Sequence, residues 1–196
     1  MLLAGGASSR FGGRPKGLEP LGTIRMADHV LGALHAVCDQ VVVCANDPDA
    51  DDWFPGHALR RDVTPGRGAL GALESALHAC DDATIVVCAW DMPFVTAAVL
   101  HALAAAVDRG EPCAVPRHDD GRLEPLCAAY SSRLAPGATA LLDAGIRAAH
   151  QLVHEHAGLT VPVAALVQDG DPTRIFFNVN TPADLHQAIR WLAHDP

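Results

Sequence analysis

The chain has 196 residues and a mass of 20.5 kDa, which predicts one domain spanning residues 1–196. Half of it is hydrophobic (49%) and only 19% is charged, so a sizeable core can form and extensive disorder is excluded. The net charge of −9 argues against a nucleic-acid binder and against a polybasic membrane patch. No apolar run approaches the roughly 20 residues of a transmembrane helix. We therefore expect a cytoplasmic protein without nucleic-acid or membrane partners.

Apolar, β-rich runs alternate with helical patterns along the chain. The expected strands are Met1–Leu3, Gln40–Ala45, His57–Arg61, Thr84–Ala89, Cys113–Arg117, Leu123–Tyr130, Val161–Val167 and Ile175–Val179. The expected helices are Met26–Val37, Ala69–Cys80, Thr96–Arg109, a broken stretch from Ser131 to His156, and Thr181–His194, with a solvated loop at Asp47–Asp52. Continuous apolar strands suit a sheet that helices bury on both faces. The pattern predicts an α/β fold with a Rossmann-like, doubly wound, mostly parallel sheet.

The six cysteines form no CxxC pair, and most of them lie inside apolar runs such as Val86-Val87-Cys88. This distribution predicts buried free thiols in a reducing compartment, and it argues against a disulfide framework.

In open α/β sheets, ligands bind at the carboxyl ends of the strands, where the strand order reverses. The polar groups expected at these ends are a glycine-rich loop after Leu3, Asn46 after the second strand, Asp62 after the third and Asp91 after the fourth. These residues are the first candidates for a functional site.

The loop after the first strand reads Leu3-Ala4-Gly5-Gly6-Ala7-Ser8-Ser9-Arg10-Phe11-Gly12-Gly13-Arg14-Pro15-Lys16. Adjacent glycines let backbone approach a ligand, and successive N–H groups can hold phosphate oxygens. Arg10 and Lys16, the only lysine of the chain, supply the cations that a polyphosphate requires. The spacing is neither that of a Walker A loop nor that of a dinucleotide GxGxxG. The alternative is a flexible glycine turn with exposed basic residues.

Asp91 directly follows an apolar strand and precedes Met92-Pro93. A carboxylate at this place can bind Mg²⁺, which bridges phosphates and neutralises the charge that develops during phosphoryl transfer. The alternative is an aspartate that caps a helix or closes a turn.

Asn178 and Asn180 alternate on a segment expected to be extended, so both side chains point to one face, close to the start of the last helix. They either line a site or brace the turn.

His150, His154 and His156 include an i,i+4 pair that could bind zinc, but no further ligand is offered, and we expect a hydrated helical face. Ser8 and Ser9 have no readable His–Asp partners for a nucleophile.

Five ordered elements of the sequence resemble those of the molybdenum-cofactor guanylyltransferase family of nucleotidyltransferases. They are the LAGGxSxRxGxxK opening, Arg67-Gly68-Ala69-Leu70-Gly71 (with Ala69 in place of the usual proline), Trp90-Asp91-Met92-Pro93 (with Trp90 in place of the commoner cysteine), Glu124-Pro125-Leu126, and Asn178-Val179-Asn180-Thr181-Pro182. The resemblance runs over nearly the whole chain. Only Met1 and Leu2 precede Leu3, whereas the family has a longer first strand, so we expect either a short strand or a misassigned start.

The resemblance implies an enzyme that transfers GMP from MgGTP to the terminal phosphate of molybdopterin and releases pyrophosphate. It implies that nucleotide binding involves Leu3, Ala4, Gly5, Gly6, Lys16, Asn46, Asp62 and Asp91, with Arg10, Lys16 and Asp91 catalytic. Asp91 would be the Mg²⁺ ligand, and Asn178 and Asn180 would bind the acceptor. Cofactor-synthesis proteins and the recipient molybdoenzymes are the further expected partners.

Two of the assigned residues also have local explanations. Asn46 precedes Asp47-Pro48, so it could form an Asx turn, and Asp62 follows Arg60-Arg61, so it could be a solvated loop acid. In the functional interpretation, the amide and the carboxylate suit the polar edge of guanine or the ribose hydroxyls.

Three other functions remain open. The cytidylyl enzyme of the same pathway usually has LAAG where this chain has Leu3-Ala4-Gly5-Gly6, so Gly6 favours guanine. A nucleotidyltransferase with a sugar-phosphate or other acceptor is the second alternative. The third is a regulatory module that binds nucleotide without catalysis, against which the presence of both Lys16 and Asp91 argues.

Overall fold

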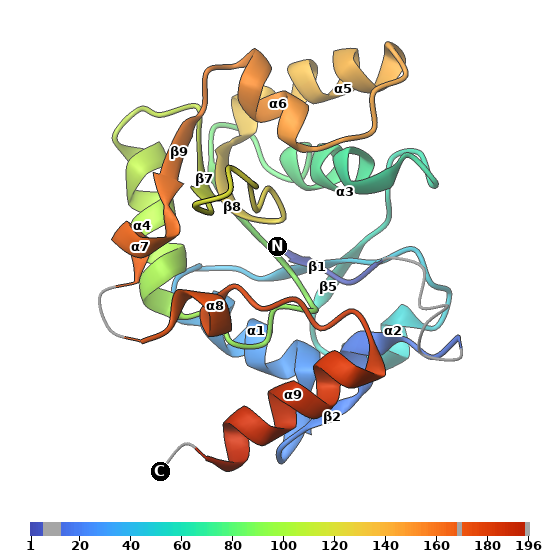
Figure 1. Cartoon of the computed structure of the whole chain (residues 1–196). Coiled ribbons are helices and arrows are strands. Elements are labelled where there is room, and N and C mark those ends of the chain that lie inside the picture. The colour runs from blue at the N-terminus through green and yellow to red at the C-terminus, as the bar shows by residue number, and fades with distance from the viewer. Residues whose placement is uncertain (6–12, 168–169, 195–196) are drawn as a thin grey trace.

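The computed structural model describes residues 1–5, 13–167 and 170–194, and in this part of the chain seven strands form one sheet (Figure 1). The strands are β1 (Leu2–Leu3), β4 (Val42–Cys44), β5 (Ala58–Arg60), β6 (Thr84–Ala89), β7 (Cys113–Arg117), β8 (Cys127–Ser131) and β9 (Leu159–Pro162). Their order is β5-β4-β1-β6-β8-β7-β9. The pairs are parallel except those of β8, which runs antiparallel to β6 and β7. The predicted mostly parallel, doubly wound sheet is confirmed.

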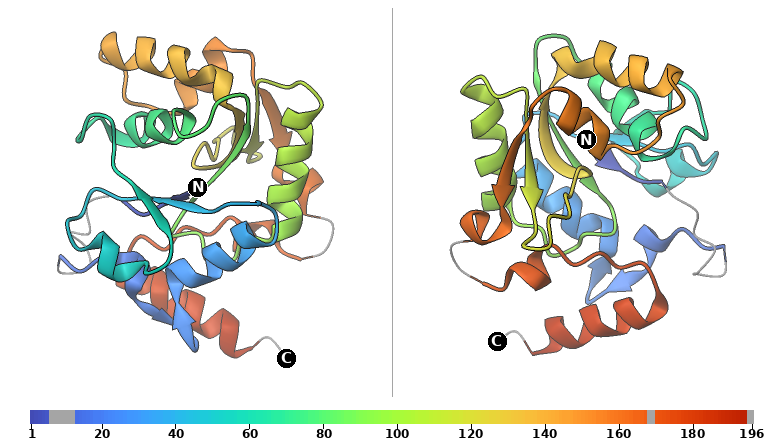
Figure 2. Two further views of the ribbon diagram at one scale, coloured as in Figure 1. Left: turned by 180° about the vertical axis from the view of Figure 1, so that it is seen from behind. Right: turned by 45° about the horizontal axis from the view of Figure 1, so that its top comes forward.

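Helices cover both faces of this sheet. One apolar cluster packs α1 (Met26–His35), α4 (Ala97–Asp108) and α7 (Val163–Leu166) on one face, and a second packs α3 (Gly68–Leu77), α5 (Ala135–Asp143) and α6 (His150–Glu155) on the other. Figure 2 shows α3, α5 and α6 grouped on one side, with α1 on the opposite side. Strand β6 contributes Val86 and Cys88 to the first cluster and Ile85 and Val87 to the second. This burial on both faces explains why the strand is apolar without alternation.

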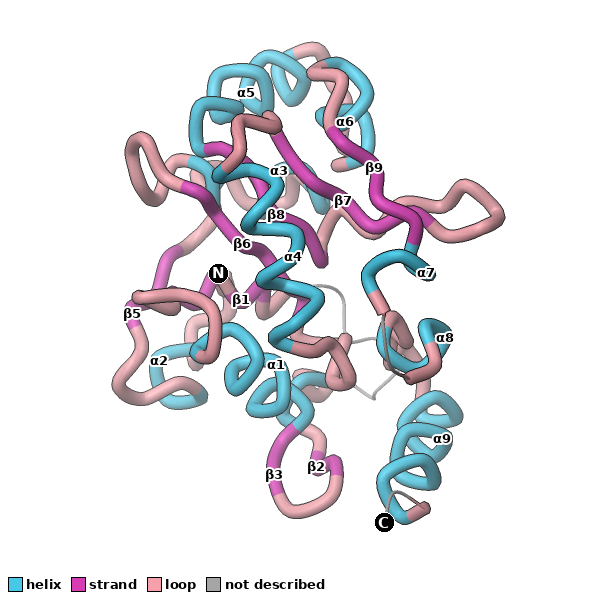
Figure 3. Tube along the Cα trace, turned by 90° about the vertical axis from the view of Figure 1, so that its left-hand side faces the viewer, coloured by secondary structure: helices cyan, strands magenta, loops and turns pink. Residues whose placement is uncertain are grey.

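A smaller cluster joins the last helix to a hairpin that the sequence analysis did not predict. The hairpin is formed by β2 (Pro20–Leu21) and β3 (Ile24–Arg25), and it lies at the same end of the molecule as α9 (Pro182–Ala193) (Figure 3). Helix α9 begins where the sequence predicted, because the Thr181 hydroxyl accepts from the Asp184 N–H at 3.1 Å and the Asp184 carboxylate accepts from the Thr181 N–H at 2.8 Å.

Several predicted boundaries are wrong. The run Val161–Val167 divides, because β9 ends at Pro162 and α7 begins at Val163; an apolar run alone does not distinguish a strand from a buried helix. The expected strand Ile175–Val179 is absent from the described structure, since Ile175 ends α8 (Pro172–Ile175), which Asp171 caps. The expected loop Asp47–Asp52 contains the start of α2 (Ala50–Trp53), and the strand expected from Leu123 begins at Cys127.

The remaining elements are short: the 3₁₀ turns η2 (Lys16–Leu18) and η3 (Ser132–Leu134).

All six cysteines are free, and four of them are buried, whereas Cys80 is exposed and Cys38 is half-buried. Burial raises the pKa of the Cys44 thiol to about 11 and that of Cys113 to about 12. Over the described ranges, no helix has both the length and the apolar character that crossing a membrane demands.

The sheet order places a switch point between β1 and β6. From β1 the chain proceeds to β4 and β5 on one side, and it then returns to β6 on the other. The connections that leave the carboxyl ends of β1 and β6 therefore run in opposite directions, and a crevice opens between these two strand ends.

Candidate active site

A cleft of about 680 Å³, here called the central cleft, lies at this switch point. The residues predicted from the sequence that line it are Leu3, Gly5, Lys16, Asn46, Asp62, Asp91 and Asn178. Ala4 lines an adjoining pocket of about 240 Å³ together with Gly5 and Asn46. Gly6 and Arg10 lie outside the described residues. Residues from five separate parts of the chain thus meet at one edge of the sheet.

The centre of the cleft is an ion pair between Lys16 and Asp91. Lys16 Nζ donates to Asp91 Oδ2 at 2.5 Å and to Asn180 Oδ1 at 2.8 Å, and both members of the ion pair are largely buried. Asp91 Oδ1 is buried and has no hydrogen-bond partner among the described residues. A buried carboxylate oxygen left open in this way is suited to a cation or to a donor from a ligand.

The alternative interpretation of Asp91, a helix cap, does not apply. The cap of α4 is Thr96, whose hydroxyl accepts from the Val99 N–H at 3.3 Å, and the side chain of Asp91 binds Lys16 instead of backbone. The carboxylate is therefore held by a residue 75 positions away and contributes nothing to the local turn.

Close packing positions Lys16 beside the end of β6. The next residue, Gly17, lies so near Trp90 that a Cβ atom on it would be 2.2 Å from the indole ring. Trp90 is itself buried and stacks on Trp53, with ring centroids 6.4 Å apart. A larger residue at position 17 would push the η2 turn, and Lys16 with it, away from Asp91.

Asn46 and Asp62 bind each other across the ends of β4 and β5. Asn46 Nδ2 donates to Asp62 Oδ2 at 2.7 Å, and Asn46 Oδ1 accepts from the Asp62 N–H at 2.8 Å. The Asx turn that could have engaged Asn46 is formed by Asp47, whose Oδ1 accepts from the Asp49 N–H at 3.0 Å. Asn46 and Asp62 thus present a linked amide and carboxylate to the cleft.

The segment from Asn178 to Asn180 is fixed by the residue between them. Val179 is fully buried, and its N–H donates to the Asp91 backbone oxygen at 2.8 Å. The two asparagines therefore flank a backbone contact to Asp91, and Asn180 reaches Lys16. The predicted alternation holds although the segment is not a strand.

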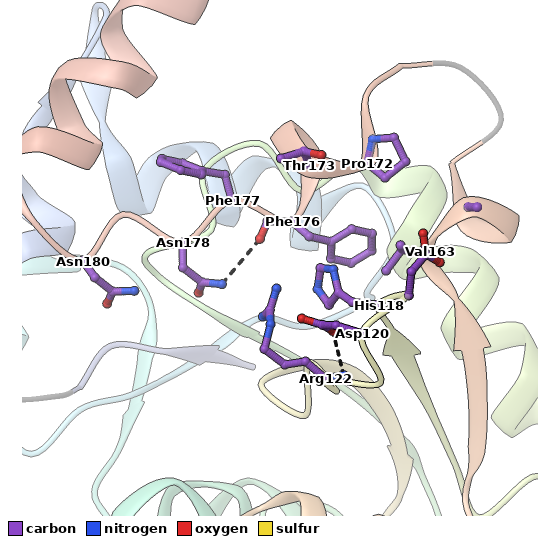
Figure 4. Close-up of a pocket in the computed structure, with 12 residues that line it drawn as sticks. His118, Asp120, Arg122, Val163, Pro172, Thr173, Phe176, Phe177, Asn178 and Asn180 are labelled. Atoms are coloured by element: carbon purple, nitrogen blue, oxygen red, sulfur yellow. Dashed lines mark hydrogen bonds between the residues drawn. The ribbon is translucent and has the colours of Figure 1, made fainter.

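A second cleft of about 710 Å³, here called the Arg122 cleft, adjoins the central cleft and shares Asn178 with it. Figure 4 shows His118 and Arg122, from the loop between β7 and β8, facing the segment that carries Phe176, Asn178 and Asn180. The two asparagines are predicted from the sequence, whereas the other residues of this cleft are not. In the sequence, Asp119-Asp120-Gly121 has the composition of a turn, and Glu124-Pro125-Leu126 is one of the family-like elements.

Glu124 organises the Arg122 cleft. Its buried Oε1 atom accepts from His118 Nε2 at 2.9 Å and also from the Arg122 guanidinium. The Glu124 N–H donates to the Pro116 oxygen at 3.0 Å, and the hydroxyl of buried Tyr130 donates to the Pro125 oxygen at 2.8 Å. The Glu-Pro-Leu element therefore holds a cation and an imidazole at the cleft wall.

The donor set of the central cleft fits a divalent cation that also binds phosphate. In the parts of the chain that the structure describes, no group of three or more His, Cys, Asp or Glu side chains could hold a metal by itself. Mg²⁺ normally takes only one or two protein carboxylates and completes its coordination with water and phosphate oxygens. The open Oδ1 atom of Asp91 matches that requirement.

The family model that describes the MobA-like NTP transferase domain matches residues 1–160. The chain belongs to this family. It is 30% identical to the molybdenum cofactor guanylyltransferase of Desulfosudis oleivorans, over 96% of this chain and 92% of the relative. It is 36% identical to a protein of Chloroflexus aggregans named "probable molybdenum cofactor guanylyltransferase", over 94% of this chain and 90% of that one.

The solved structures agree with this assignment. The crystal structure of molybdopterin-guanine dinucleotide biosynthesis protein A from Archaeoglobus fulgidus superposes with a TM-score of 0.84 at 27% identity, covering 99% of this chain and 98% of that one. This MobA-like chain is therefore an enzyme, a nucleotidyltransferase.

Proposed function

We propose that this MobA-like enzyme transfers GMP from MgGTP to the terminal phosphate of molybdopterin, releasing pyrophosphate and forming the guanine dinucleotide cofactor. The names of its relatives support the guanylyl transfer. The observation that carries the proposal is the position of Lys16, which binds Asp91 in the central cleft and Asn180 in the Arg122 cleft. A single ammonium thus lies where the contents of the two clefts meet.

The nucleotide would occupy the central cleft. Gly5 lines it without a side chain, so backbone can approach the phosphates, and Lys16 supplies the charge that binds them. Leu3 and Ala4 would add backbone contacts, and Gly6 and Arg10 would extend the phosphate contacts, as the family resemblance implies. Asn46 and Asp62 offer an amide and a carboxylate to the polar edge of guanine or to the ribose.

The metal proposed is Mg²⁺, held by the open Oδ1 atom of Asp91 together with substrate oxygens. When bound, it would neutralise the charge that develops on the phosphates. Once Asp91 is engaged in this way, Lys16 is free to turn from the carboxylate to the triphosphate. The ion pair therefore keeps both groups in place before the substrate arrives.

The acceptor would occupy the Arg122 cleft. Its wall combines the apolar side chains of Phe176 and Val163 with the polar groups of His118, Arg122 and Asn178, which suits a flat, polar ring system. Asn180 and Lys16 mark the end of this cleft nearest the nucleotide, so the acceptor phosphate would lie there. An acceptor phosphate oxygen then attacks the α-phosphorus in line, the bond to the leaving pyrophosphate oxygen breaks, and no covalent enzyme intermediate forms.

We also propose that residues 1–196 act as one domain, because α9 and the segment before it complete the site beyond the family match. The six free thiols favour a cytoplasmic reaction. Cofactor-synthesis proteins and recipient molybdoenzymes would be the partners that supply the acceptor and take the product.

Pyrophosphate release with molybdopterin and either GTP or CTP tests the proposal. We expect a kcat/KM for GTP at least about 100-fold above that for CTP, because a site built to pair with one base leaves buried polar groups unpaired with another. Equal values for the two nucleotides would exclude the guanylyl assignment while leaving the family assignment intact. Release with GTP but without molybdopterin dependence would exclude the acceptor.

A further inference from the structure

His150 lines the central cleft, although the sequence grouped it with a hydrated helical face. It is the first residue of α6, its side chain is exposed, and its ring lies edge to face with that of His154 at 5.8 Å. His154, one turn further along the helix, is also exposed but is not among the residues that line the cleft. His150 is also not among the residues that line the Arg122 cleft.

The end of the cleft near His150 differs from the end near Lys16. Lys16 and Asp91 are bound to Asn180, which precedes α9, whereas His150 comes from the layer of α3 and α6 on the other face of the sheet. Figure 1 shows α3 and α6 together on one side of the sheet and α9 on the other. Because the phosphates would bind Lys16, the end of the cleft near His150 is available to the nucleoside.

Small side chains line this end of the cleft. The start of α3 is tied to the segment before α6 by the Leu70 N–H, which donates to the Arg147 oxygen at 3.2 Å. The cleft-lining residues contributed by these two segments include Ala69, Ala72, Ala148 and Ala149. Methyl groups at this end provide an apolar surface against which a flat base can pack, and they offer no hydrogen-bond donor to a phosphate.

We propose that His150 is a specificity-determining residue whose imidazole N–H donates a hydrogen bond to N7 of the purine base. Asn46 and Asp62, which follow β4 and β5, line the central cleft and supply polar groups to the base. His150 lines the same cleft from the start of α6, together with the alanines of α3 and of the segment before α6. Its N–H group would bind N7, which is an acceptor in every purine and has no counterpart in a pyrimidine. This inference rests on the proposed function.

Equilibrium binding of nucleotides in the presence of Mg²⁺, without acceptor, tests the inference. The wild type, His150→Ala and the matched control His154→Ala would each be titrated with GTP, with 7-deaza-GTP, which lacks the N7 acceptor, and with CTP. We expect His150→Ala to weaken GTP about 3- to 10-fold, the value of one hydrogen bond, and to leave CTP unchanged. The wild type should lose the same factor on 7-deaza-GTP, whereas His150→Ala should bind GTP and 7-deaza-GTP equally. His154→Ala should match the wild type throughout.

Two results would overturn the inference alone: equal weakening of GTP and CTP by His150→Ala, or a His150→Ala variant that still discriminates against 7-deaza-GTP as the wild type does. A wild type that binds CTP as tightly as GTP would instead overturn the proposed guanylyl function, and the inference with it. The two failures are therefore distinguishable in one set of titrations.

Discussion

Asp91 and Glu74 are both buried carboxylates, with 8% and 2% of their surface exposed. Each has one oxygen atom without a hydrogen-bond partner in the described structure. Asp91 lines the central cleft and is paired with Lys16 at 2.5 Å. Glu74 lies between α3 and α5, where Oε1 accepts from the Thr139 hydroxyl at 2.7 Å and Oε2 is 3.8 Å from Arg67 Nη1. Burial and an open oxygen do not by themselves identify a functional carboxylate; access to a cleft separates the two.

The surroundings of each acid indicate what it does. Arg67 also binds Asp143 at 2.9 Å, so the Glu74 group joins the start of α3 to the end of α5. The contacts of Glu74 and Arg67 hold α3 and α5 together. Lys16, in contrast, binds Asp91 and Asn180 across the mouth of two clefts, and neither contact is needed to form a helix or strand. Activity should therefore depend on Asp91 and stability on Glu74.

The largest effect is expected from Asp91→Asn, which keeps the shape of the side chain and removes its charge. We predict a loss of kcat on the order of 100- to 1,000-fold, because a neutral amide oxygen binds a divalent cation and the Lys16 ammonium much less strongly than a carboxylate does. Pyrophosphate release measures the loss, and thermal unfolding should show a folded protein. A loss below about 10-fold would remove Asp91 from the catalytic group.

Lys16→Arg should lower kcat/KM by roughly 10- to 100-fold although it preserves the charge. The ammonium fits between Asp91 and Asn180 with 14% of the side chain exposed, and the planar guanidinium needs more room and a different donor geometry. Arg14→Lys, the reverse exchange at an exposed neighbouring position, is the matched control and should behave as the wild type. Full activity of Lys16→Arg would show that only the charge matters.

Glu74→Ala should reverse the pattern by costing stability and sparing activity. Removing the buried carboxylate takes one acceptor from Thr139 and the nearby negative charge from Arg67, at a cost of about 3 kcal/mol in the free energy of unfolding. Urea denaturation measures this cost, and Glu74→Gln should lose less because its amide oxygen can still accept from Thr139. A large fall in kcat/KM for the folded Glu74→Gln variant would contradict the division of roles.

Much of the site followed from the sequence because strand ends are predictable. The apolar run Thr84–Ala89 placed Asp91 at the edge of the sheet, and the glycine-rich loop after Leu3 brought Lys16 there too. The contact between Lys16 and Asn180 spans 164 residues, and local patterns give elements without giving the distance between them. The contact between Lys16 and Asn180 was therefore found only in the structure.

The wrong element boundaries and the missed Arg122 cleft have the same cause, because local patterns do not give tertiary packing. The Val161–Val167 run is apolar throughout, so its division into β9 and α7 depends on packing against α4 and β7. The Arg122 cleft is formed by a loop and by the segment after α8, neither of which has a periodic pattern. Glu124 belonged to a recognised element, but its bonds to His118 and Arg122 depend on how the loop folds back.

The ion pair between Arg25 and Asp28 is more exposed than the other two, and we expect its loss to have the smallest effect on stability and activity. Asp28 accepts from Arg25 Nε at 2.8 Å and from the Arg25 N–H at 3.1 Å, in a capping box at the start of α1, and both side chains are about one-third exposed. The side-chain hydrogen bond from Arg25 is the main cause that lowers the pKa of Asp28 below its usual 3.8. Asp28→Asn should cost about 1 kcal/mol or less at neutral pH and leave kcat/KM unchanged.

The pH dependence of this loss follows from the direction of the pKa shift. Because the pKa of Asp28 is lower in the folded chain than in the unfolded chain, its contribution to stability is complete above the usual value of 3.8. The contribution disappears as the pH falls through the lowered pKa of the folded state. The difference in unfolding free energy between the wild type and Asp28→Asn should therefore be constant from pH 7 to about 5 and shrink below about pH 4. Urea denaturation at each pH measures it, and a difference that grows on acidification would show that the carboxylate is not held by Arg25.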